Sequence, residues 1–319
     1  MHKRYITAVA TMAIMAVPIF GFIERQAIFD ALRLRGYVPS ENVVQLATDT
    51  AMLDRTRQIF YVYHPSIEEK SVFNQSCRDN EQTIVLGCYV DGKGIHILNI
   101  DDVRLTGVEQ VTAAHETLHA LYARLSKNER KRVDAMTAAA FKSLTDQRVK
   151  DTIELYRKQD PTIVPNELHS ILGTEVRVLP AELEAYYKQY FSDRSKTVGF
   201  SEQYEQAFTE RKNQIAAYDA ELNSLKLKID NLQNELTSDT ESLSRQRQQL
   251  DSLRSDAAAY RSAVSSYNNN VNAYNVKIDR LTGLVAQYND IVPRRNAIAS
   301  EEQDLVKAID SRESVPGKQ

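Results

Sequence analysis

Hydrophobic and polar positions divide the chain into three stretches. Residues 5–23 form one uncharged run, residues 24–200 mix helical and alternating patterns, and from about residue 204 apolar side chains recur every seven positions. An uncharged run of this length predicts a membrane-spanning helix, and a sustained heptad repeat predicts a coiled coil. The sequence therefore predicts a compact domain with a transmembrane helix before it and a long coiled-coil helix after it.

The uncharged run follows His2-Lys3-Arg4 and just spans a bilayer core of roughly 30 Å. It has no small-x-small site near its end, so the pattern favours an uncleaved signal anchor at residues 1–23, with a cleaved signal peptide as the alternative. Basic residues before the span predict a cytoplasmic N-terminus. We expect a single-pass protein of the cell membrane whose C-terminal bulk is extracytoplasmic.

The pattern of residues 24–200 predicts an α+β domain that is mainly helical. The run Gln58–Tyr63 is rich in β-branched and aromatic residues and predicts a strand. Residues 84–90 and 95–100 flank an Asp-Gly-Lys-Gly turn and predict a β-hairpin. Helices are expected at residues 24–35, 43–57, 127–144 and 147–158.

The next predicted helix contains the candidate metal-binding and catalytic residues. It contains His115-Glu116-Thr-Leu-His119, and a capping box of Thr106 and Glu109 is expected at its start. Residues four apart share a helix face, so the two histidines can bind one zinc ion while Glu116 takes a proton from a metal-bound water. The alternative is an ordinary amphipathic helix with half-buried, hydrogen-bonded histidines.

A strand pair directly before an H-E-x-x-H helix resembles the zincin metallopeptidases, and the resemblance covers residues 84–191. It implies a zinc ion and an edge strand that binds extended peptide along the cleft. Within that superfamily, Asn166-Glu167-Leu-His-Ser170 resembles the segment from which gluzincins take a third ligand, Glu167 here. The chain departs from the pattern at Ile171, where many gluzincins carry an acidic residue that supports a ligand histidine.

A second carboxylate competes for the role of third ligand. Glu175 follows Glu167 by two helical turns and lies within about 80° of it on a helical wheel. We prefer Glu167, keep Glu175 as the rival, and leave a site with neither as the remaining case. The isolated His64 and His96 are expected to have packing or surface roles.

The two cysteines of the chain, Cys77 and Cys88, fall in a loop and in the first strand of the predicted hairpin. Two cysteines cannot form a four-thiolate zinc site, which leaves the histidine motif as the metal candidate. In an exported domain we expect a Cys77–Cys88 disulfide, and the alternative is two free buried thiols.

The heptad repeat runs from Tyr204 to Val292 and predicts a coiled coil at residues 201–292. As one continuous helix it would be roughly 130 Å long. The alternative is that residues 236–240 form a hinge or the bend of a helical hairpin. Pro293 is expected to interrupt the helix, so that residues 293–319 form a short helix and a polar tail. Such a seam predicts self-association or partner binding.

The net charge of −3 gives no reason to expect nucleic acid as a partner. The features together favour a membrane-anchored, extracytoplasmic zinc metallopeptidase that acts on peptide or protein substrates. The alternative is a cell-envelope coiled-coil scaffold whose zincin-like domain recognises a partner and is weakly active or inactive. Glu116 favours the enzyme, because a purely structural zinc site has no need of that carboxylate.

Overall fold

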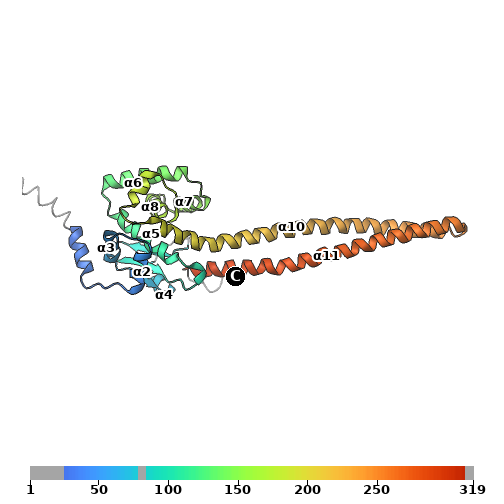
Figure 1. The fold of residues 1–319 in the computed structure, drawn as a ribbon, viewed down its shortest axis with the longest axis horizontal. Coiled ribbons are helices and arrows are strands. Elements are labelled where there is room, and N and C mark those ends of the chain that lie inside the picture. Colours follow the sequence, from blue (N-terminus) through green and yellow to red (C-terminus); the bar gives the residue numbers. More distant parts are fainter. Residues whose placement is uncertain (1–24, 78–83, 313–319) are drawn as a thin grey trace, which may run out of the picture. The chain divides into compact units, whose positions relative to one another are not determined.

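The computed structural model describes residues 25–77 and 84–312 (Figure 1). The chain forms two compact units: Met1–Ala207 with Val306–Gln319, and Phe208–Leu305. The predicted signal anchor at residues 1–23 lies outside the described residues. Within the described part of the chain, every helix is too short or too polar to cross a bilayer.

The first unit is an α+β fold, mostly helical, with one three-stranded sheet. The strands β1 (Ser66–Glu68), β2 (Gly87–Val90) and β3 (Gly94–Leu98) lie in the order β1-β3-β2. β1 is parallel to β3 and β2 is antiparallel to it, so the β2–β3 pair confirms the predicted hairpin. β2 is an edge strand, because only one of its sides pairs within this sheet.

The central helix of this unit is α5 (Val108–Ala123). The sheet, with α2 and α3, packs on one side of α5, and α8 packs on the other, with α6 and α7 beyond it (Figure 1). The 16-residue α5 is buried along most of its length, as expected of a helix enclosed on both sides. The remaining helices of the unit are 25–34, α2 (Glu41–Asp49), α3 (Asp54–Val62), α4 (Lys70–Ser76), the 3-10 turn η1 (Val103–Leu105), α6 (Lys127–Ser143), α7 (Gln147–Gln159), α8 (Val164–Glu175) and α9 (Ala181–Tyr187).

The start of α5 differs from the predicted capping box. Gly107 is the N-cap, with a φ of 107° that favours glycine. A side chain there would also be blocked, because its Cβ would lie 2.7 Å from the carbonyl oxygen of Phe200. The Glu109 carboxylate accepts a hydrogen bond from the backbone N–H of Ile100 at 3.0 Å instead of capping the helix. It therefore ties α5 to the end of the hairpin.

The strand predicted at Gln58–Tyr63 is wrong, because these residues lie in and at the end of α3. The helix predicted at residues 43–57 is two helices, α2 and α3, separated by a turn at residues 50–53. Ile59, Phe60 and Val62 are buried from α3, and that burial outweighs the strand preference of β-branched and aromatic residues. The helices predicted at 24–35, 127–144 and 147–158 are confirmed.

Two long antiparallel helices, α10 (Arg194–Ser252) and α11 (Ala257–Ile309), form the second unit between Phe208 and Leu305. The first turns of α10, up to Ala207, belong to the first unit. Ion pairs cross between them along the pair: Arg211–Glu301 at 3.1 Å, Asp219–Arg295 at 2.9 Å and Asp239–Lys277 at 2.7 Å. The structure therefore has the helical hairpin that was one of the expected arrangements, and not one continuous helix. The chain reverses at Leu253–Asp256 and not at residues 236–240.

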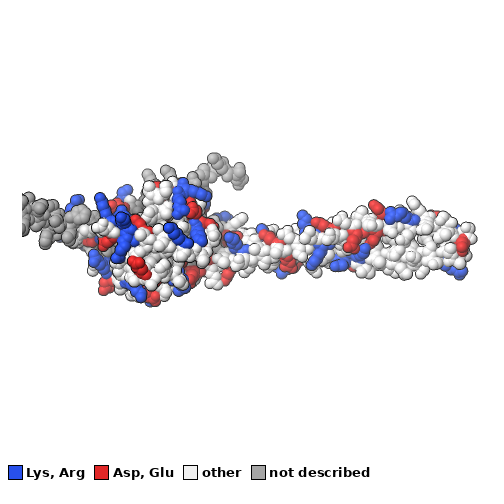
Figure 2. Space-filling view, turned by 90° about the horizontal axis from the view of Figure 1, so that it is seen from above, with Lys and Arg blue, Asp and Glu red and all other residues white. Residues whose placement is uncertain are grey.

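The predicted interruption at Pro293 is also wrong, because α11 runs through it. The neighbouring side chains hold this stretch in place: Ile291 is buried and Arg295 pairs with Asp219. Residues 262–276 of α11 carry no Lys, Arg, Asp or Glu. Figure 2 shows white, uncharged surface between the charged side chains of the helix pair.

Candidate metal centre

His115 and His119 lie one turn apart on α5 and point toward the same place. Their Nε2 atoms are 3.0 Å apart, and the rings meet edge to face. His115, Glu116 and His119 each offer a ligand atom, and these atoms lie within 4.8 Å of one another. The three residues form a group that could hold a metal ion.

Glu167 approaches the two histidines from α8. One carboxylate oxygen lies 3.5 Å from His119 Nε2, and the other, Oε2, lies 3.6 Å from His115 Nε2. Oε2 is buried and has no hydrogen-bond partner among the described residues. Burial alone would raise the pKa of Glu167, but the two histidines outweigh it and hold that pKa below its ordinary value. This buried carboxylate oxygen beside two imidazole nitrogens forms a donor set that fits a metal cation.

Ser170, one turn after Glu167, supports His119 from behind. The Ser170 hydroxyl lies 3.2 Å from His119 Nδ1, the ring nitrogen away from the centre. Ligand histidines commonly bind a second group through this other nitrogen, which fixes the ring orientation and tautomer. The sequence showed Ser170 as a small residue at a suggestive spacing, but did not show this contact.

Glu175 is engaged elsewhere. Its carboxylate pairs with Arg148 of α7 at 2.7 Å, and Arg148 also contacts Glu205 at 3.3 Å. Burial and the nearby Glu175 raise the pKa of Glu205 more than Arg148 lowers it. Sequence reasoning missed Arg148, because nothing in the pattern of α7 marks it as a partner of α8.

A cavity of about 450 Å³ joins these groups. Its lining includes residues 84–89, which lead into and begin β2, the motif face of α5, and residues of α7, α8 and the start of α10. Gly87 brings β2 close to α5, since a Cβ on Gly87 would lie 2.4 Å from Thr112 Cγ2 and 3.0 Å from Glu116 Cγ. The edge strand therefore passes directly over Glu116.

The other described histidines have structural contacts, as was expected of the isolated His64 and His96. His169 is fully buried, its Nε2 lies 3.0 Å from the Tyr186 hydroxyl, and burial lowers its pKa to about 3. His64 stacks on Tyr37 with ring centres 4.3 Å apart. His96 contacts the Glu68 carboxylate at 2.7 Å.

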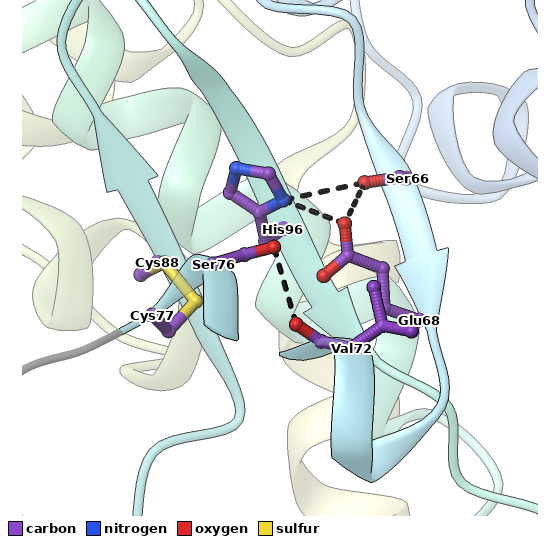
Figure 3. Close-up of a disulfide and its surroundings, with 7 residues drawn as sticks. All are labelled: Ser66, Glu68, Val72, Ser76, Cys77, Cys88 and His96. Atoms are coloured by element: carbon purple, nitrogen blue, oxygen red, sulfur yellow. Dashed lines mark hydrogen bonds and ion pairs between the residues drawn. A yellow bond between two sulfur atoms is a disulfide. The ribbon is translucent and has the colours of Figure 1, made fainter. Parts of the chain in front are cut away.

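The predicted Cys77–Cys88 disulfide is confirmed, with the two Cα atoms 5.9 Å apart. It joins the end of α4 to the edge strand β2 (Figure 3). In the β2–β3 pairing Cys88 lies opposite His96, so the Glu68–His96 pair is a close neighbour of the disulfide. The bond fastens the strand that lines the cavity.

Comparison of the chain with protein-family models, with curated proteins and with solved structures gave no match. The function is therefore argued from the geometry of the centre and its cavity.

Proposed function

We propose that the first unit is a zinc metallopeptidase that hydrolyses peptide bonds. The observation that carries the proposal is the convergence of His115, His119 and Glu167, with a buried Glu167 oxygen that has no hydrogen-bond partner in the part of the chain that the structure describes. Two imidazoles and one carboxylate are a common ligand set of catalytic zinc, which keeps one position open. A zinc ion bound there would supply Lewis-acid chemistry, activating water and polarising a peptide carbonyl.

The two carboxylates near the histidines have different roles in this proposal. Glu167 is the third ligand, because it contacts both ligand nitrogens from the opposite helix. Glu116 is the general base: it accepts a proton from the attacking water and passes it to the leaving amine. Its buried position in the cavity lining suits a group that works on a bound substrate. Glu175 is the weaker ligand candidate, because it is already paired with Arg148.

The substrate would bind along β2. The strand lines the cavity, and one of its edges is unpaired within the sheet. An extended peptide can add to such an edge through main-chain hydrogen bonds. Gly87 would then place the peptide backbone beside Glu116.

We further propose that residues 1–23 anchor the enzyme in a membrane, with the units described above on the extracytoplasmic side. The uncharged run and the basic residues before it support this orientation. The disulfide also supports it, because structural disulfides are typical of oxidising compartments.

One observation favours a scaffold function. The helical hairpin at residues 208–305 carries exposed apolar side chains such as Leu227 and Val276, which a self-associating or partner-binding stalk would use. A scaffold does not need Glu116 in a cavity beside two convergent histidines, so the peptidase remains the main proposal.

The first test is elemental analysis of the full-length chain purified in detergent. We expect about one zinc per chain in the wild type, loss of zinc in His115→Ala and Glu167→Ala, and retention in the matched control Glu175→Ala. Retention in Glu167→Ala with loss in Glu175→Ala would reverse the ligand assignment. Absence of bound zinc in the wild type, even after zinc is added back, would refute the enzyme proposal.

The second test separates an enzyme from an inactive zinc domain. Glu116→Gln should keep its zinc and lose cleavage of an unfolded protein substrate, because the amide cannot accept the proton. If the zinc-loaded wild type cleaves no more than Glu116→Gln does, the scaffold function is the correct one.

A further inference from the structure

The helix at residues 25–34 exposes an apolar face. Ile28 is 54% exposed, Leu32 is 64% exposed and Phe29 is 36% exposed. Residues three and four apart lie on one side of a helix, so these three side chains form a stripe. We call it the N-terminal stripe. Hydrophobic side chains gathered in this way commonly mark an interaction site.

The opposite face of the helix is fixed to the first unit. Both oxygens of Asp30 pair with Arg124, at 2.8 and 2.9 Å. Arg33 donates hydrogen bonds to the backbone carbonyls of Val62 at 3.0 Å and Lys93 at 2.8 Å. The N-terminal stripe is therefore held outward by specific contacts on the other side of the helix.

The chain before the helix indicates what covers the stripe. The uncharged run ends at Ile23, two residues before the first described residue of the helix, so a membrane span there would end beside the stripe. Arg25 and Arg35 are exposed near the two ends of the helix, and its one described acid, Asp30, is neutralised by Arg124. An apolar face with basic residues beside it is typical of helices that lie in the interface of anionic bilayers.

We propose that the helix at residues 25–34 lies in the bilayer interface, with the N-terminal stripe in the acyl boundary and Arg25 and Arg35 at anionic headgroups. Because Asp30 and Arg33 fix the helix to the first unit, this contact also fixes the orientation of the unit on the membrane. The inference goes beyond the proposed enzyme activity and rests on the proposed anchor, not on the zinc chemistry.

The test uses the absence of tryptophan from the chain. Leu32→Trp places one tryptophan in the N-terminal stripe, and Val103→Trp places one at an exposed apolar position of the same unit as the matched control (Val103 is 85% exposed). The full-length chain is reconstituted into phosphatidylglycerol vesicles, with and without brominated acyl chains. We expect blue-shifted emission and strong quenching by brominated lipid for Leu32→Trp, and neither for Val103→Trp.

Other outcomes would overturn the inference. If Leu32→Trp shows neither the blue shift nor the quenching, like Val103→Trp, the helix does not lie in the interface. That result is expected of a helix that continues straight out of the membrane. Equal quenching in phosphatidylglycerol and in phosphatidylcholine would refute the role of the arginines. Flotation with the vesicles tests the anchor separately, and a chain that does not float also overturns the inference. Zinc content is measured on the same samples, so failure of the metal centre is distinguished from failure of the membrane contact.

Discussion

Gly173 lies where α8 crosses α5 and offers a direct test of how packing sets the metal centre. A Cβ at this position would lie 2.5 Å from Leu118 Cδ1 and 2.8 Å from Tyr187 Cε1. Both neighbours are fully buried, so neither can turn into solvent. Gly173→Ala must therefore push α8 away from α5 or displace two core side chains.

The magnitude follows from two opposing effects. Overpacking a well-filled core costs about 1–3 kcal/mol, while alanine is favoured over glycine inside a helix by about 1 kcal/mol. The matched control is Gly199→Ala in α10, where the nearest atom to a new Cβ is 3.9 Å away. Gly199→Ala therefore gains the helix preference of alanine without steric overlap in the core. The difference in stability between the two variants therefore isolates the packing cost, about 1–3 kcal/mol.

The assay is thermal unfolding of the full-length protein, together with zinc affinity measured by chelator competition. In a unit of this size, 1 kcal/mol corresponds to roughly 2–4 °C, so Gly173→Ala should melt about 2–12 °C below Gly199→Ala. Zinc affinity should fall with it on the order of tenfold, because Glu167 lies on α8 and the histidines on α5. If both variants melt together and bind zinc equally, the close crossing does not set the ligand geometry.

Three further predictions test the cavity and its walls. Gly87→Ala should lower peptidase turnover on the order of tenfold to a hundredfold with zinc retained, since it moves the edge strand off Glu116; unchanged kcat would contradict this. Glu205→Gln should raise the melting temperature at pH 7 but not at pH 4. The pKa of Glu205 is higher in the folded than in the unfolded chain, so the ionised carboxylate destabilises the fold above the unfolded pKa of about 4.3, and at pH 4 this cost is absent. Its control Glu175→Gln should destabilise at pH 7 by leaving Arg148 without its nearest partner, and equal shifts in the two variants would refute the argument. Opening the disulfide with reductant should cost about 3 kcal/mol of stability by loop entropy, which melting with and without reductant measures; an unchanged melting temperature would contradict this estimate.

Local signals were sufficient for several parts of the structure. The turn between residues 90 and 95 fixes the hairpin, because Gly92 adopts a φ of 70° that favours glycine. The spacing of His115 and His119 needs only a helix to bring the two rings together. The disulfide was predicted from the expected compartment and from the positions of the two cysteines, one in a loop and one in the first hairpin strand.

The choice between Glu167 and Glu175 needed a tertiary contact. A helical wheel places both carboxylates on nearby sides of α8, and intrinsic properties do not separate them. Their contacts differ in the structure, because Arg148 pairs with Glu175 from another helix 27 residues earlier in the chain, and the proposed choice of Glu167 rests partly on this difference. No periodic pattern in α7 reports that contact.

The reversal of the long helices at Leu253–Asp256 was hidden by the heptad repeat. A heptad seam requires a partner helix but does not say whether the partner belongs to the same chain. One local signal was present: Asp256 accepts hydrogen bonds from the backbone N–H groups of Ala258 and Ala259, each at 3.1 Å. An aspartate before an alanine-rich stretch is a typical helix start, so the sequence did mark the beginning of α11.

The departure at Ile171 has a structural explanation that supports the centre. Ile171 is buried in the apolar core, where an acidic side chain would be costly to desolvate. The preceding residue, Ser170, contacts His119 Nδ1 at 3.2 Å and so provides the support expected from an acid. A short side chain reaches the ring only because α8 lies close to α5, and Gly173 permits that close crossing one turn later. The absence of an acid at Ile171 and the close packing of α8 on α5 are therefore related: Gly173 permits the close packing, and the close packing lets Ser170 reach His119.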